Sequence, residues 1–510
     1  MPHVLLHAVG PSWGHSKPLT SFMLLLAESR EDVVVTFLTD SLYTQILREL
    51  LKAPRGRLQK VESRVNVINI KGPKLGFLDT PEFAVVFQQL WKGNGSVTCV
   101  SSEKIFANLP RPDLVILDPV AGYANMEAIR KLATRQELPV WTWFTSTIGY
   151  TVREWSPRHL GGKGDDWKDI VAVDNEEEIS ARGKLLNQKR EKLISIPGYP
   201  PMYHHELFPQ EQIFDIPVGA YTVVYKYIQE TEGYISVTTS VLEKDATDAW
   251  REYLRSLGKE FYEVGFVSST LAVSESKDNG HSDVMGFLDK MAREYGENSV
   301  IYISFGSVWW PSEPEKLYAI IDELIKDNTA FLLANPKSPL PSVGPIPEGI
   351  LAQIKECKFG HATAWAPQED VLRHPATGWF LSHGGWNGLQ EALVYRVPPI
   401  FWPLSGDQPL NAALVSVQHQ AAFELISVRG GEGAKRPARY ADDQHDPDFS
   451  IDAVRSEFKM VLERMKGKEG ETIRRNFDNL ASAVSKLWND GGLSRKELDL
   501  FVRRHLSTTK

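Results

Sequence analysis

The sequence predicts an α/β fold with two doubly wound halves, each built on a parallel sheet. The chain of 510 residues is longer than one hydrophobic core usually serves, so at least two domains are expected. Short apolar segments alternate with helical segments in both halves, which is the pattern of parallel sheets covered by helices. A polar, serine-rich stretch at residues 268–282 separates the halves and predicts a linker.

Composition and charge exclude several classes of protein. The chain is 42% hydrophobic and 24% charged, and its net charge of −8 with a pI near 6.0 argues against a nucleic-acid partner. Only two cysteines occur, which fits a reducing compartment. The start of the chain has no signal-peptide pattern, and no apolar run of about 18 residues predicts a membrane span. We expect a cytoplasmic monomer.

In the first half, apolar segments predict strands at residues 4–8, 33–38, 65–70, 114–117 and 140–144. The first helix is predicted over residues 16–28, with Pro18 in its first turn, where a missing N–H is tolerated. Residues 150–235 carry charged runs and a proline-rich aromatic piece, which predict helices and loops. A further strand at residues 234–239 leads to a helix near residues 248–257.

The strand–helix alternation restarts after the linker. Strands are predicted at residues 300–304, 331–334, 362–365, 379–382 and 399–402. Residues 429–449 are polar and glycine-containing, and we expect them to form an exposed loop before two terminal helices.

Three residues of the first half follow predicted strands. His15 comes after the first strand, Asp118 ends the strand at 114–117, and Thr145 follows the strand at 140–144. In open parallel sheets, ligands bind at the carboxyl ends of strands. A histidine and an aspartate at neighbouring strand ends can act as a base and the group that orients it. Taken alone, His15 also fits a structural role, and Asp118 before a proline also fits a turn.

Residues 365–408 carry the densest set of functional groups. A strand ending at Ser382 is followed by His-Gly-Gly and by a helix from Trp386 to Tyr395. Backbone N–H groups at a helix start attract anions, and glycines allow a phosphate to approach closely. Trp365 offers a face for stacking a base, and Glu391 can hold two sugar hydroxyls. These groups together predict a nucleotide-sugar site.

This stretch resembles the signature of the family-1, UDP-dependent glycosyltransferases, known best from plant secondary metabolism. It shares their length, Trp-Ala-Pro-Gln at the start, His-x-Gly-Trp-Asn in the middle, Glu391 after it, and Asp-Gln at the end. Two positions depart from the pattern. Gly384 stands where plant members usually have Cys, and Gly388 stands where they usually have Ser.

The resemblance implies the GT-B architecture, in which two Rossmann-like domains face each other across a cleft. We then expect an N-terminal acceptor-binding domain over residues 1–267, the linker 268–282, a UDP-sugar-binding domain over residues 283–490, and a C-terminal helix in 491–510 that packs back on the first domain. The family works without a metal or other cofactor, and no metal-binding motif or P-loop is present in this sequence.

The family's roles carry over to matching residues of this chain. His15 would be the catalytic base and Asp118 its orienter. Residues implied to bind the UDP-sugar are Thr145, Ser307, Trp365, Ala366, Gln368, His383, Trp386, Asn387, Gly388, Glu391, Asp407 and Gln408. Ser307 belongs to a Ser-Phe-Gly-Ser step, and Asp407-Gln408 favours glucose in the donor.

The resemblance implies an inverting transfer from a UDP-sugar to a hydroxyl of a small apolar or aromatic acceptor. Aromatic residues that can line the acceptor pocket are Trp13, Phe87, Trp91, Tyr123, Phe144 and Phe208, although such residues also fit a core. Two alternatives stay open on the sequence. One is a UDP-sugar hydrolase or epimerase on the same fold, and the other is a UDP-sugar sensor without catalysis.

Overall fold

The computed structural model describes residues 1–8, 13–71, 81–93, 95–173, 175–186, 192–211, 218–270, 279–307, 309–335, 346–441 and 447–506. Contacts divide the chain into two compact units. Unit 1 comprises Met1–Asn187, Ile216–Ser274 and Lys486–Lys510, and unit 2 comprises Gln188–Asp215 and Glu275–Ser485. Of the predicted linker, residues 271–278 lie outside the described residues, and its ends lie in the 3-10 helix Val267–Thr270 and in helix α11 (Asn279–Tyr295).

Unit 1 is built on a seven-stranded parallel sheet of order β11-β10-β7-β6-β1-β2-β3. Its strands are β1 (His3–His7), β2 (Val34–Thr39), β3 (Val65–Asn69), β6 (Leu114–Leu117), β7 (Val140–Phe144), β10 (Gly233–Ser236) and β11 (Glu260–Glu263). An antiparallel hairpin, β4 (Gly95–Thr98) with β5 (Ile105–Leu109), forms a separate two-stranded sheet. The described helices of unit 1 are α1 (Trp13–Ser29), α2 (Tyr43–Leu51), α3 (Arg55–Val61), α4 (Pro81–Trp91), α5 (Pro119–Arg130), α6 (Ile148–Trp155), α7 (Gly164–Val171), α8 (Glu176–Leu186), α9 (Val218–Glu230), α10 (Ser240–Ser256) and α19 (Leu493–His505).

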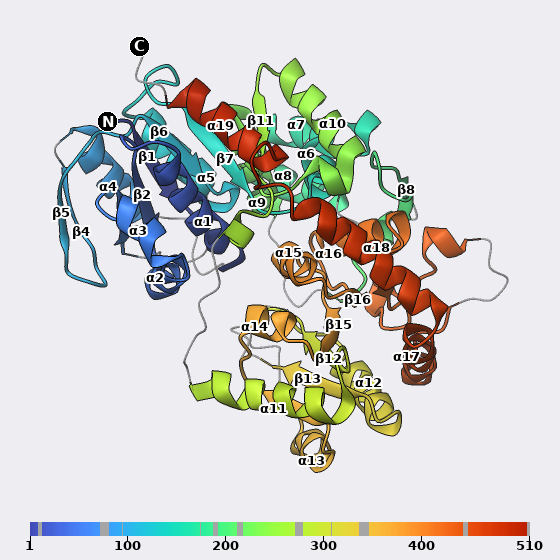
Figure 1. The fold of residues 1–510 in the computed structure, drawn as a ribbon. Coiled ribbons are helices and arrows are strands. Elements are labelled where there is room, and N and C mark those ends of the chain that lie inside the picture. The colour runs from blue at the N-terminus through green and yellow to red at the C-terminus, as the bar shows by residue number, and fades with distance from the viewer. Residues whose placement is uncertain are drawn as a thin grey trace. The chain divides into compact units, whose positions relative to one another are not determined.

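Unit 2 is built on a six-stranded parallel sheet of order β14-β13-β12-β15-β16-β17. Its strands are β12 (Val300–Ser304), β13 (Ala330–Ala334), β14 (Gly360–Thr363), β15 (Thr377–Ser382), β16 (Pro399–Phe401) and β17 (Phe423–Glu424). Besides α11, its helices are α12 (Pro314–Lys326), α13 (Glu348–Glu356), α14 (Gln368–Arg373), α15 (Trp386–Tyr395), α16 (Gln408–Ala413), α17 (Ile451–Met465) and α18 (Lys468–Val484). The prediction of two doubly wound α/β halves is confirmed (Figure 1).

Each sheet has one position where the direction of winding reverses. In unit 1 the chain runs from β1 to β2 and β3 on one side, and from β6 to β7 on the other. Because parallel crossovers are right-handed, the helices that follow β1 and β6 lie on opposite faces of the sheet. The two strands that diverge, β1 and β6, are neighbours, and so are β12 and β15 in unit 2. Such switch points are where ligands bind in open α/β sheets.

Several boundaries differ from the sequence prediction by a few residues, and two of the differences have a local reason in side-chain hydrogen bonds. Strand β14 ends at Thr363 and not at Trp365, because the Thr363 hydroxyl donates to the Trp365 carbonyl and turns the chain. Helix α10 begins at Ser240, since the Thr239 side chain accepts the Val241 N–H at 3.2 Å.

The segment 188–215 belongs to unit 2 by its contacts, although in sequence it interrupts unit 1. It carries the small antiparallel pair β8 (Leu193–Ile194) and β9 (Met202–Tyr203), followed by the 3-10 helix His204–Leu207. Glu206 of this helix accepts the Ala438 N–H at 2.8 Å and lies 3.5 Å from Arg429. The prediction that residues 429–449 form an exposed loop is therefore wrong at its start, because Arg429 is only 2% exposed.

α19 packs within unit 1. Its Phe501 ring meets Trp141 and Tyr262 edge-on, with centroids 5.2 and 5.3 Å apart. The described residues of α19 contact strand β11 and helix α1.

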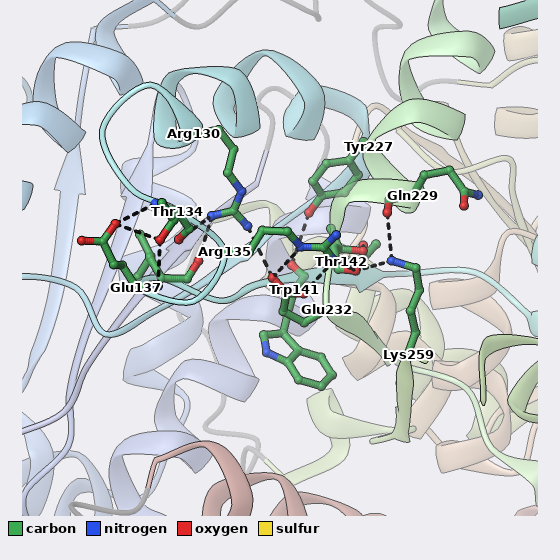
Figure 2. Close-up of polar contacts among 12 residues, drawn as sticks. Arg130, Thr134, Arg135, Glu137, Trp141, Thr142, Tyr227, Gln229, Glu232 and Lys259 are labelled. Atoms are coloured by element: carbon green, nitrogen blue, oxygen red, sulfur yellow. Dashed lines mark hydrogen bonds and ion pairs between the residues drawn. The ribbon is translucent and has the colours of Figure 1, made fainter. Parts of the chain in front are cut away.

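A polar network ties the amino-terminal ends of β7, β10 and β11, at the edge opposite the strand ends that carry Asp118 and Thr145 (Figure 2). Arg135 pairs with Glu232 at 2.8 Å, and Lys259 donates to the Gln229 carbonyl at 3.0 Å. Ligands bind at the carboxyl edge, so this network has a structural role.

Glu243 holds the start of α6 from the neighbouring helix. It is 2% exposed, and its carboxylate accepts the Ile148 N–H at 2.8 Å and the Gly149 N–H at 2.9 Å. The Thr238 hydroxyl also donates to it. A negative charge at a helix start satisfies N–H groups that have no partner inside the helix.

Replacing Glu243 by Ala should lower the stability of the protein by about 3 kcal/mol, because two N–H groups and a hydroxyl lose a charged acceptor. Thermal unfolding measures the change. Glu252→Ala is the matched control, since Glu252 is an exposed residue of the same helix, and it should change stability by less than about 0.5 kcal/mol. Equal melting temperatures for the two variants would contradict the capping role of Glu243.

His3 at the start of β1 predicts a loss of stability in acid. Its ring nitrogens are bonded to the Pro110 carbonyl at 2.7 Å and to the Thr36 hydroxyl at 2.8 Å, and burial lowers the pKa of His3 to about 4. Between pH 6.5 and 4 the unfolded state binds the proton more readily than the folded state. Stability is therefore present above pH 6.5 and falls by about 3 kcal/mol as the pH approaches 4. Denaturant unfolding of wild type and His3→Gln from pH 7 to 4 measures this, and parallel pH profiles would contradict it.

Candidate active site

His15 and Asp118 lie together at the switch point of unit 1. Asp118 follows β6, is 1% exposed, and its Oδ2 accepts a hydrogen bond from Nδ1 of His15. Its Oδ1 accepts the Val120 N–H at 3.0 Å, which caps helix α5. Asp118 therefore forms both the turn and the contact with His15. Because a carboxylate holds the proton on Nδ1, the lone pair of the neutral ring lies on Nε2, as a general base requires.

His15 is held by a helix and not by a loop. It lies in the first turn of α1, and its side chain is 31% exposed while its partner is buried. Thr145 directly follows β7 and is half-buried. The start of α6 beyond it offers no anion site at Ile148 and Gly149, since Glu243 already accepts those N–H groups.

In unit 2, the groups expected to meet the base and ribose are brought together. Trp365 is 53% exposed and Ala366 is buried. Gln368 donates from Nε2 to Oε2 of Glu391 at 2.6 Å, and its Oε1 accepts the Tyr302 hydroxyl at 3.4 Å. These two hydrogen bonds fix the orientation of the Gln368 amide and of the Glu391 carboxylate. A carboxylate and an amide held in this way suit a pair of sugar hydroxyls.

The turn from β15 into α15 has the features of an anion site. α15 begins at Trp386 after Gly385, and no side chain caps its start. Gly384 adopts φ +84°, which favours glycine. Asn387 and Gly388 lie in the first turn of this helix. An uncapped helix start of this kind attracts phosphate.

The imidazole of His383 packs closely against the backbone of two glycines, Gly306 and Gly385. A Cβ atom at Gly306 would lie 3.0 Å from Cε1 of His383, and one at Gly385 would lie 2.5 Å from Nε2. Gly306 lies in the turn after β12, and His383 lies in the turn after β15. Because the two residues are in contact, these turns meet at the switch point of unit 2, next to the exposed Ser307. Burial lowers the pKa of His383 to about 4, so the ring is neutral at pH 7. A neutral ring offers one N–H donor and one lone pair.

The residues expected to bind the transferred sugar are held within their own loop. Gln408 is 2% exposed, and its Oε1 accepts the N–H groups of Leu404 at 2.9 Å and Ser405 at 3.0 Å. Asn411 donates to Oδ2 of Asp407 at 2.9 Å. Trp386 is 3% exposed. The carbonyl oxygen of the Gln408 side chain is thus engaged, which leaves its amide N–H groups to meet a ligand.

The aromatic residues predicted for the acceptor pocket lie in different surroundings. Phe87 is fully buried and stacks between Phe83 and Trp91, with centroids 6.0 and 5.9 Å apart. Arg111 covers the Trp91 ring at 3.3 Å. Phe87 and Trp91 therefore form one row along α4.

The other four candidates are separate from this row. Trp13 begins α1 and is half-buried, and Tyr123 of α5 lies 5.9 Å from the Lys226 ammonium. Phe144 is 5% exposed and meets Trp155 edge-on. Phe208 belongs to unit 2, where its ring contacts His204.

Sequence reasoning missed three residues that the structure places at these sites. Tyr302 orients Gln368, Phe83 continues the aromatic row, and His7 ends strand β1 beside Asp118, whose N–H donates to the His7 carbonyl at 3.0 Å. A polar residue at the end of an apolar strand is the signal that marks His7. Tyr302 carries no such signal, because an aromatic residue inside a strand ordinarily indicates a core.

Within the described residues, no helix is long and apolar enough to cross a membrane, and no group of three His, Cys, Asp or Glu residues is placed to hold a metal ion.

Comparisons with known proteins place the chain in a family. Residues 275–429 match the model of the UDP-glucoronosyl and UDP-glucosyl transferase family. The chain is 26% identical over 518 residues to UDP-glycosyltransferase eriJ of Hericium erinaceus, and the match covers 96% of each protein.

Solved structures of similar fold cover nearly the whole chain. A UGT transferase from Siraitia grosvenorii in complex with UDP matches with a TM-score of 0.69 at 20% identity, over 99% of this chain and 100% of that one. Phytolacca americana UGT2, complexed with UDP-2fluoro-glucose and pterostilbene, matches with a TM-score of 0.65 at 21% identity and the same coverage. At this identity the likeness establishes the shared GT-B fold.

The signature at residues 365–408 agrees with the two parallel sheets, with the family match over residues 275–429 and with the relative that aligns from end to end. The chain therefore belongs to the family-1 UDP-glycosyltransferases, enzymes that transfer a sugar from a UDP-sugar to a small acceptor.

Proposed function

We propose that this enzyme is an inverting glucosyltransferase that moves glucose from UDP-glucose to a hydroxyl of a small apolar or aromatic acceptor, with His15 as the base. The observation that carries the proposal is the hydrogen bond between the buried Asp118 carboxylate and Nδ1 of His15. Unit 1 binds the acceptor, and unit 2 binds the UDP-sugar. The Phytolacca enzyme bound to UDP-2fluoro-glucose and pterostilbene supports this donor and acceptor class.

The reaction proceeds by one displacement. Nε2 of His15 takes the proton of the acceptor hydroxyl as its oxygen attacks the anomeric carbon of glucose. The bond between that carbon and the diphosphate oxygen breaks, and UDP leaves with the electron pair. Asp118 stabilises the imidazolium that forms. Attack from the side opposite the leaving group inverts the anomeric configuration.

The second unit holds the donor through groups already in place. Trp365 stacks on uracil, with the backbone of Ala366 at its edge, and Gln368 with Glu391 takes the ribose hydroxyls. The N-terminus of α15, the neutral His383 and Ser307 meet the diphosphate and offset its charge. Trp386, Asp407, Gln408 and Thr145 bind the glucose. The amide N–H groups of Gln408 donate to glucose hydroxyls, since the side-chain oxygen is engaged by Leu404 and Ser405.

His15→Ala should lower glucose transfer by about 10²–10⁴-fold, because the acceptor loses its base. UDP binding should stay within about threefold of wild type, since His15 lies in unit 1 and the donor groups lie in unit 2. UDP release from UDP-glucose, measured with and without phenolic acceptors, gives the first quantity, and calorimetric titration with UDP gives the second.

His159→Ala is the control for this change, because His159 is an exposed histidine of unit 1. It should transfer glucose like wild type. Equal losses of transfer and of UDP binding in His15→Ala would contradict the separation of roles. UDP release that does not depend on an acceptor would show that the enzyme is a hydrolase.

Glu391→Ala should remove the preference for ribose over deoxyribose. Wild type is expected to bind UDP about tenfold more tightly than 2′-deoxy-UDP, because a site built to bond a hydroxyl is left unpaired without it. In the variant the ratio should fall below about threefold. Glu356→Ala, at an exposed carboxylate of α13, keeps the full ratio. An unchanged ratio in Glu391→Ala would place the ribose elsewhere.

A further inference from the structure

Strand β1 carries two buried histidines that differ in the hydrogen bonding of their ring nitrogens. His3 is 0% exposed and His7 is 1% exposed. Both ring nitrogens of His3 have partners within the protein, the Pro110 carbonyl and the Thr36 hydroxyl. In His7, Nδ1 bonds to the Leu38 carbonyl at 2.9 Å, but Nε2 is buried and has no hydrogen-bond partner within the described part of the chain. Buried polar atoms are nearly always paired, so this atom needs an explanation.

The chemistry of the missing partner follows from the bond that is present. A carbonyl oxygen only accepts hydrogen bonds, so Nδ1 of His7 carries the ring proton. Burial lowers the pKa of His7, which keeps the ring neutral. Nε2 therefore presents a bare lone pair, and the partner it lacks is a donor: an O–H or N–H group.

The His7 ring lies near Asp118, the residue that bonds to the proposed base His15. His7 is the last residue of β1, at the switch point, and its register partner on β6 is Leu117, which precedes Asp118. Both Asp118 and Asp40 lie close enough to the His7 ring to influence its charge. Asp40, at the end of β2, is itself 7% exposed, and its Oδ2 is a second buried acceptor without a partner. Nε2 of His7 and Oδ2 of Asp40 are thus two buried acceptor atoms without a donor among the described residues.

The side chain packed against His7 is aromatic. The His7 ring lies against Phe83 with centroids 5.1 Å apart, and Phe83 begins the row that continues through Phe87 to Trp91. Apolar surroundings raise the cost of leaving a lone pair unmet, and they make a matching donor correspondingly selective.

We propose that Nε2 of His7 accepts a hydrogen bond from a second hydroxyl of the acceptor, so that the enzyme selects aromatic acceptors with at least two hydroxyl groups. One hydroxyl gives its proton to His15 and reacts, and the other donates to His7 and orients the molecule. His7 is thus a specificity-determining residue for the acceptor. The inference rests on the proposed function, because it requires that unit 1 binds the acceptor.

The test compares matched acceptors across variants of one residue. Positional isomers of dihydroxybenzene and dihydroxynaphthalene are each paired with the compound that lacks one hydroxyl, and kcat/KM is measured for both. In wild type at least one diol should exceed its partner by about tenfold or more, because the compound without the hydroxyl leaves Nε2 unpaired.

The variants separate the two ring nitrogens. In His7→Asn the side-chain amide can still donate to the Leu38 carbonyl, but nothing replaces Nε2, so the preference should fall below about threefold. In His7→Gln the amide oxygen reaches toward the position of Nε2, so part of the preference should return. His3→Asn changes the partnered histidine of the same strand and should keep the preference of wild type. Melting temperatures confirm that each variant is folded.

Failure of the inference is distinguishable from failure of the proposed function. If wild type transfers glucose to none of the acceptors, the proposed function fails. If wild type transfers glucose but the diol preference is the same in His7→Asn, an ordered water satisfies Nε2 and the inference is overturned. If His3→Asn loses the preference as fully as His7→Asn, the effect comes from strand β1 as a whole, and His7 has no specific role.

Discussion

The reversal of winding in each parallel sheet is the constraint on which both candidate sites depend. At β1 and β6 the chain leaves neighbouring strands toward opposite faces, so the segments that follow them separate. His7, His15 and Asp118 all lie there. In unit 2 the same constraint acts at β12 and β15, where Gly306 and His383 meet. Residues far apart in sequence are thus delivered to one edge by hydrogen bonds between strands.

Desolvation decides the charge of the histidines near these edges. Burial lowers the pKa values of His3, His7 and His383, so each is neutral at pH 7. A neutral imidazole has one donor and one acceptor, and the bond made by one nitrogen determines what the other can offer. At His383 the ring N–H meets the Ser304 backbone, and Nδ1 is buried without a partner among the described residues. In the proposed function, the start of α15 therefore offsets most of the charge of the diphosphate.

Many of the polar groups are already bonded to the protein before a ligand arrives. Tyr302 orients Gln368, which bonds to Glu391, and the backbone of Leu404 and Ser405 holds Gln408. Such bonds restrict each side chain to one rotamer, so less conformational entropy is lost on binding. They also limit what each residue can contribute: the side-chain oxygen of Gln408 is engaged by two N–H groups, and Oε2 of Glu391 accepts from Gln368. The role of a site residue in this protein is therefore set by which of its polar atoms already have a partner in the fold.

Local pattern alone determined the fold class, most strands, and the family. Strands β6, β7 and β12 and helix α15 begin and end where their apolar runs and glycine turn predict, because these features act over a few residues. The signature named the proposed donor-site residues because they are close in sequence. The sequence also named His15 and Asp118, but only as separate candidates at strand ends.

Only the tertiary structure decided the contacts made over long distances in the chain. It placed segment 188–215 with unit 2 through Glu206 and Arg429, and it buried a residue predicted for an exposed loop. It also distinguished His3 from His7, which look alike in sequence. The physical reason is that hydrogen bonding and burial depend on partners brought together by folding, whereas periodicity and turn chemistry are properties of neighbouring residues.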